Sequence, residues 1–76
     1  MHNYTMTFNG IREYILENEI TDSFAIVLHP FDFDRVALDY ISIHETIERP
    51  FEILGIEILE DTSGKVPKNQ VMIIEL

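Results

Sequence analysis

The stretch of sequence that determines the fold is residues 24–44, FAIVLHPFDFDRVALDYISIH. It opens with five consecutive apolar residues, 24–28, a length that predicts a strand buried on both faces and therefore central in its sheet. His29 and Pro30 end this strand, because proline has no N–H for a β-ladder and its fixed φ suits the first turn of a helix.

The rest of this stretch predicts an amphipathic helix. Apolar residues recur at i, i+3, i+4, i+7 and i+8 from Phe33 to Ile41, with His44 at i+11, while charged and polar residues take the opposite face. We expect Asp32 to be the N-cap, since its carboxylate suits the positive end of the helix dipole. The helix is expected to fade near Glu45.

Upstream of this stretch, the sequence predicts a first helix from about Phe8 to Asn18. Phe8, Ile11 and Ile15 repeat at helical spacing. Thr7 is the expected N-cap, and Asn18 is expected to end the helix because asparagine tolerates the left-handed conformation.

Downstream, the pattern changes to that of strands. Residues 51–54 predict a short strand that Gly55 interrupts with a bulge or a kink. Residues 56–58 alternate as a half-buried strand does. Residues 61–65 predict a turn, and the apolar run at 71–74 predicts a last strand in the interior of the sheet.

These elements predict one small α+β domain. The chain has 76 residues and shows no linker, so residues 1–76 form a single domain, and the sequence leaves open whether residues 1–6 are ordered. The order helix-strand-helix-strand-(strand)-strand favours a two-layer sandwich, with both helices on one face of a sheet of three or four strands.

Composition excludes several classes of function. Fourteen acidic residues against five basic ones give a net charge of -9, so nucleic-acid phosphates and anionic membranes repel the chain. The absence of cysteine excludes a disulfide framework and thiol chemistry. Because no signal peptide is visible and no apolar run approaches the roughly 20 residues of a membrane span, we expect a soluble cytoplasmic protein.

Two clusters invite a chemical interpretation. His29, Asp32 and Asp34 could together hold a divalent cation. A simpler explanation is that His29 ends the strand and the two aspartates cap and charge the start of the helix. The segment from His44 to Glu48 is similar to the zinc-protease pattern, but glutamate stands where the second histidine belongs. No nucleophile elbow or glycine-rich phosphate loop is present, so we expect no catalytic residue, no cofactor and no enzyme activity.

The apolar content of the strands points instead to a protein partner. If both helices cover one sheet face, alternate residues of two apolar strands still face the other side. Phe31 also falls outside the apolar stripe of its helix and is a candidate contact residue. The sequence therefore favours an acidic protein-interaction or assembly module that forms a homo-oligomer.

Residues 28–30, LHP, and 54–58, LGIEI, resemble the late part of the major capsid proteins of HK97-type tailed phages. In that family a strand ends in a polar residue and proline, and a helix, a Leu-x-Gly-x-Pro-Val-like strand and a final strand follow. The resemblance covers residues 24–76, with Glu57 where the family pattern usually has proline. It implies a phage-related α+β assembly module and transfers no functional residue.

Two alternatives remain open at this point. An acidic chain can act as a nucleic-acid mimic that occupies the binding site of a basic partner. The other alternative is a small metal-dependent enzyme that uses His29, Asp32 and Asp34.

Overall fold

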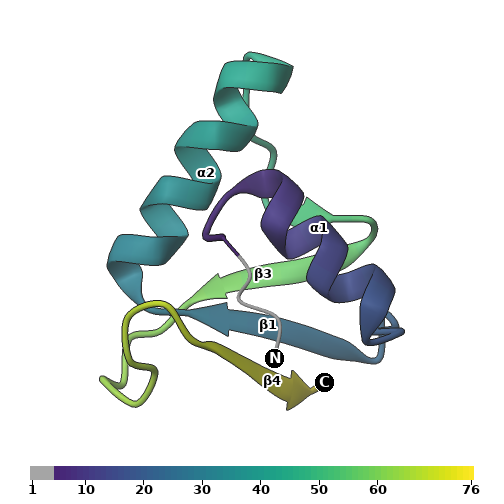
Figure 1. Cartoon of the computed structure of the whole chain (residues 1–76), viewed down its shortest axis with the longest axis vertical. Helices are drawn as coiled ribbons and strands as arrows, with labels where there is room; N and C mark the ends of the chain where they lie inside the picture. Colours follow the sequence, from purple (N-terminus) through teal and green to yellow (C-terminus); the bar gives the residue numbers. More distant parts are fainter. Residues whose placement is uncertain (1–4) are drawn as a thin grey trace.

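A computed structural model of the chain describes residues 5–76, and within them two helices pack on one four-stranded sheet (Figure 1). The predicted α+β fold is therefore confirmed. The elements in chain order are α1 (Phe8–Glu17), β1 (Phe24–Leu28), α2 (Pro30–His44), β2 (Glu52–Ile53), β3 (Ile56–Glu60) and β4 (Val71–Glu75).

The sheet has the strand order β2-β3-β1-β4. Strand β1 runs parallel to β3 and antiparallel to β4, and β2 pairs antiparallel with β3. The predicted central position of β1 is confirmed. The prediction that the last strand lies in the interior is wrong, because within residues 5–76 β4 pairs with β1 alone and forms an edge of the sheet.

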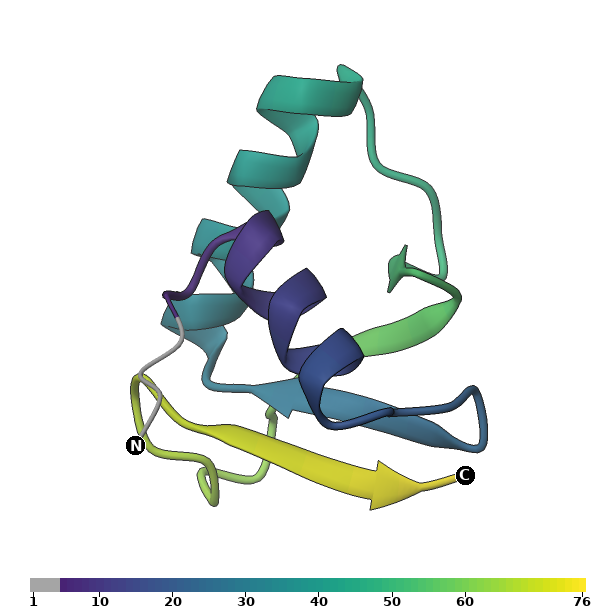
Figure 2. The same cartoon turned by 45° about the vertical axis from the view of Figure 1, so that its right-hand side comes forward.

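Both helices cover the same face of the sheet (Figure 2). The core lies between these two layers, because successive side chains of a strand point to opposite faces and one set meets the helices. Its central members are Ile11, Ile15, Val36, Ile26, Leu28, Ile53, Ile56 and Ile58.

Helix α1 begins as predicted, with the Thr7 side chain accepting a hydrogen bond from the Gly10 N–H. Its end differs by one residue, because Asn18 has φ -98° and Glu19 takes the left-handed conformation at φ 52°. The N–H of Ile20 donates to the Ile15 carbonyl, and the N–H of Glu19 donates to the Leu16 carbonyl. These two bonds form a Schellman motif, which requires the left-handed residue at position 19.

Helix α2 begins three residues earlier than predicted. His29, and not Asp32, is the N-cap, and its Nδ1 accepts a hydrogen bond of 3.0 Å from the Phe31 N–H. Because Pro30 already has the φ of a helix, it occupies the first helical position and leaves the cap to the residue before it. The helix ends at His44, and Glu45 reverses the chain at φ 68°.

The predicted bulge or kink at Gly55 is also wrong. Leu54 and Gly55 form the two-residue turn of the β2–β3 hairpin, with φ of 53° and 78°. Positive φ at both positions is the signature of a type I′ turn, whose twist matches that of the flanking strands. Of the predicted strand 51–54, only Glu52–Ile53 pairs in the sheet.

Of the segment 1–6, whose order the sequence leaves open, residues 1–4 lie outside the described residues. Met6 is 4% exposed and belongs to the core. Within residues 5–76, neither helix has the length and apolar character needed to cross a bilayer.

Candidate interaction surface

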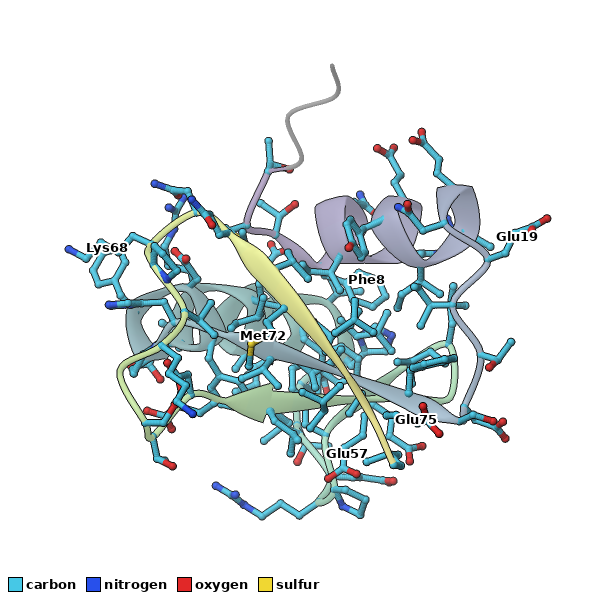
Figure 3. The ribbon with its side chains drawn as sticks, turned by 90° about the horizontal axis from the view of Figure 1, so that it is seen from below. Phe8, Glu19, Glu57, Lys68, Met72 and Glu75 are labelled. Carbon is cyan, nitrogen blue, oxygen red and sulfur yellow. The ribbon has the colours of Figure 1, made fainter. Side chains whose placement is uncertain are left out.

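The face of the sheet opposite the helices carries no described element. Strand register places Glu57, Ala25 and Ile74 in one row across β3, β1 and β4, and Leu59, Val27 and Met72 in the next. Figure 3 views the molecule with the edge strand β4 nearest the viewer, and the labelled side chains of Met72 and Glu57 lie on the side of the sheet away from α1. We call this surface the uncovered face and define it by Glu52 and these six residues.

The exposures on the uncovered face show how its side chains are arranged. Ala25 and Val27 of the central strand are 0% and 6% exposed, although both described helices lie on the other face of the sheet. Leu59, Met72 and Ile74, on the two neighbouring strands, are half-buried. The larger flanking side chains therefore cover the smaller central ones, and together they form an apolar surface.

The side of the uncovered face that β2 and β3 form is acidic. Glu52 of β2 lies directly opposite Glu57 of β3. Like charges in this position destabilise a strand pair slightly. The apolar part of the face is thus bordered by two carboxylates along the β2–β3 side.

The structure gives separate positions to the three candidate metal ligands. His29 caps α2, and Asp34 is exposed. Asp32 is buried, and its Oδ2 accepts a hydrogen bond of 2.6 Å from the Asn69 N–H, which ties α2 to the loop before β4. Across residues 5–76 no three His, Asp or Glu side chains gather in a way that could hold a metal ion.

A hollow of about 620 Å³ opens beside the carboxyl ends of the parallel strands β1 and β3, and its lining includes His29, Glu60, Asp61 and Lys68. Ligands of α/β proteins often bind at such strand ends. Here, however, Asp61 accepts hydrogen bonds from Ser63 and Val66 of its own loop. The hollow therefore brings polar groups together, one of which already holds its own loop.

Asp61 is the buried carboxylate that organises the loop after β3. Its Oδ1 accepts hydrogen bonds from the Ser63 N–H and hydroxyl, and its Oδ2 accepts one from the Val66 N–H. These bonds, the Ser63 hydroxyl above all, lower the pKa of Asp61 from 3.8 to about 2. Sequence reasoning placed Asp61 in a turn and missed this role, although an Asp two residues before Ser is a signal of an Asx-turn.

The remaining candidates lie on α2. Phe31 is 54% exposed, and the Lys68 ammonium lies 5.0 Å from the centre of its ring. His44 is exposed and stacks on Tyr40, with ring centres 4.1 Å apart. Because α2 ends at His44, the rest of the zinc-protease-like segment lies beyond the helix and cannot present Glu48 one turn away on the same face.

Comparison of the chain with models of protein families, with curated proteins and with solved structures gives no match. The chain's own surface therefore has to indicate its function, and the uncovered face is the most distinctive part of that surface.

Proposed function

We propose that this chain is a non-enzymatic protein-interaction module that self-associates, and that the uncovered face is the surface through which it does so. The observation that carries the proposal is the one-sided cover of the sheet: both helices lie on one face, and Leu59, Met72 and Ile74 line the other. Burying such apolar side chains against a partner is favourable in proportion to the area removed from water.

The size of the uncovered face sets the expected strength of association. Three adjacent strands at about 4.8 Å spacing, with five residues at about 3.4 Å each, span a footprint of roughly 240 Å². Stable complexes bury roughly 800 Å² per partner. The face alone therefore supports a weak, concentration-dependent contact rather than a permanent one.

The geometry of such a contact follows from sheet packing. Two uncovered faces would meet at about 10 Å separation with their strands roughly 30° apart, and the helices would lie on the outside of the resulting four layers. The proposal places the module in the cytoplasm, in keeping with its composition, and in a phage-related assembly, in keeping with the resemblance of residues 24–76.

Light scattering on a sizing column, across a concentration series, tests the proposal. We expect the molar mass of the wild type to rise towards a dimer or beyond at high micromolar concentration. Leu59→Lys, which places a charge in the middle of the uncovered face, is expected to associate less than the wild type at every concentration. A wild type that remains monomeric at several hundred micromolar would contradict the proposal.

Leu38→Lys is the matched control. Leu38 is 66% exposed on α2, a helix that covers the opposite side of the sheet. The substitution makes the same change of side chain and charge as Leu59→Lys, but it leaves the uncovered face intact. Equal behaviour of the two variants would show that charge, and not the uncovered face, governs the association. Phe31, exposed on the same helix, is the second residue to substitute if Leu38→Lys weakens association.

A further inference from the structure

Strand β4 is an open edge of the sheet. It pairs with β1 on one side, and no strand within residues 5–76 pairs with the other. Proteins usually protect such edges with lysine, proline or a bulge. The run Val71–Ile74 contains no charged residue and no proline, so the edge is left open to another strand.

The hydrogen bonds of the sheet identify the backbone groups that face outwards. The Leu76 N–H donates to the Ser23 carbonyl at 2.9 Å, which makes these two residues a hydrogen-bonded pair. Because such pairs alternate along an antiparallel ladder, residues 72 and 74 also bond to β1. The N–H and C=O groups of Val71, Ile73 and Glu75 therefore point away from the sheet.

We infer that a second copy of this chain adds to the edge of β4, antiparallel, about a two-fold axis at Ile73. In this register the outward groups of Ile73 bond to those of Ile73 in the second copy, and those of Val71 bond to those of Glu75 in the second copy. Met72 then lies beside Ile74 of the second copy, so the uncovered faces of both copies join into one wider surface. This edge is a different surface from the uncovered face, through which the contact proposed above forms.

Charge along β4 favours this occupant and this direction. Lys68 lies near the beginning of the strand and Glu75 near its end (Figure 3). Antiparallel pairing places the Glu75 end of each copy near the Lys68 end of the other, whereas parallel pairing would set the two Glu75 carboxylates side by side. Since residues 71–74 are uncharged, no like charges face each other within the antiparallel pair.

Comparison of Ile73→Pro with Ile73→Ala tests the inference. Both variants remove the isoleucine side chain. Only proline also removes the outward N–H, which makes no hydrogen bond to β1. By sedimentation equilibrium, we expect Ile73→Pro to dissociate at least roughly tenfold more readily than Ile73→Ala. Circular dichroism establishes that both are folded. Equal association of the two variants would overturn the inference.

A cysteine pair provides a test that does not depend on the proline variant folding. The chain has no cysteine, and residues 73 of two copies would have Cα atoms about 5.5 Å apart, within the reach of a disulfide. We expect Ile73→Cys to form a disulfide-linked dimer on oxidation and Met72→Cys to form none. Linkage through Met72→Cys alone would overturn edge pairing and support the face contact. If Ile73→Pro is monomeric while Leu59→Lys associates as tightly as the wild type, edge pairing stands and the face proposal fails.

Discussion

The carboxylate of Asp39, in α2, accepts a hydrogen bond of 2.7 Å from the backbone N–H of Phe8, the first residue of α1. The two residues are 31 positions apart in the chain, so one helix caps the other. Thr7 satisfies a second N–H of the same helix end by accepting a bond from Gly10. The negative charge of Asp39 also lies at the positive end of the α1 dipole, which stabilises the pair of helices.

Replacing Asp39 should therefore weaken the contact between the helices. We expect Asp39→Ala to lower the free energy of unfolding by about 1–2 kcal/mol, and Asp39→Asn, which keeps an acceptor oxygen, to lower it less. Urea denaturation measures both. Asp34→Ala, at an exposed position of the same helix, is the control, and a loss no larger than that of Asp34→Ala would show that the Asp39–Phe8 bond adds no stability.

The hydrogen bond between Asp39 and Phe8 could not be predicted from the sequence. Thr7 could be identified as a cap because a cap bonds within its own helix turn, but the partner of Asp39 depends on how the two helices pack. The sequence favours Asp32 as the cap of α2 and assigns His29 only to the end of the strand, whereas Pro30 takes the first helical position and leaves the cap to His29. The apolar run of β4 resembles that of a central strand, since composition does not say how many neighbours a strand has.

The candidate surface was predicted in outline and not in detail. Apolar strands with helices on one side already implied a second apolar face, and the structure contains it. Its rows could not be predicted, because the parallel pairing of β1 with β3 brings Val27 beside Leu59 across 32 positions of sequence. The burial of Asp61 was likewise hidden, since the turn pattern does not show which carboxylate oxygens the folded loop uses.

Asp61 should make stability depend on acidic pH. Its pKa in the folded chain, about 2, lies below the ordinary value of 3.8, so the unfolded chain binds the proton more tightly. The stabilisation is complete above about pH 4 and is lost as the pH falls towards 2. We expect the difference in melting temperature between the wild type and Asp61→Asn to narrow over that range.

The comparison with Asp61→Asn separates this residue from the other acidic groups, because they titrate in both proteins. A difference in melting temperature that stays constant from neutral pH to pH 2 would show that the Asp61 charge does not contribute. In that case Asp61 would stabilise its loop only through its hydrogen bonds and not through its negative charge.

Replacing Gly10 by alanine should destabilise the folded chain, although alanine is the better helix former. A Cβ at Gly10 would overlap the backbone carbonyl oxygen of Thr5. The intrinsic preference for alanine is about 1 kcal/mol, and overpacking costs about 1–3 kcal/mol, so we expect Gly10→Ala to lower the melting temperature. Asn9→Ala, at the exposed neighbouring position, should not lower it. A higher melting temperature for Gly10→Ala would mean that residue 5 moves aside without cost.

Replacing Leu54 by asparagine should raise the stability of the folded chain. Leu54 has φ 53° at the first position of the β2–β3 turn and is exposed, so it bears the strain of the left-handed conformation without packing in the core. Asn-Gly is the preferred pair for such a turn. We expect Leu54→Asn to raise the free energy of unfolding by roughly 0.5–1 kcal/mol, measured in urea, whereas Gly55→Ala should lower it by a similar amount.

Self-association, if it proceeds through apolar contact, should strengthen with salt. Each copy carries a net charge of -9, so two copies repel each other at any approach. Screening shortens the reach of this repulsion from about 10 Å at 0.1 M salt to about 3 Å at 1 M. We therefore expect the dissociation constant, measured by sedimentation equilibrium, to fall between about 0.1 M and about 1 M NaCl.

Leu38→Lys is again the useful control, because it makes each copy one unit less negative without changing either candidate contact. Its dissociation constant should lie below that of the wild type in low salt and approach it in high salt, where the charges are screened. The opposite trend, with association weakening as salt is added, would mean that attraction between opposite charges holds the copies together. Neither the uncovered face nor the uncharged run of β4 could then be the main contact, since apolar burial and backbone pairing do not weaken on screening.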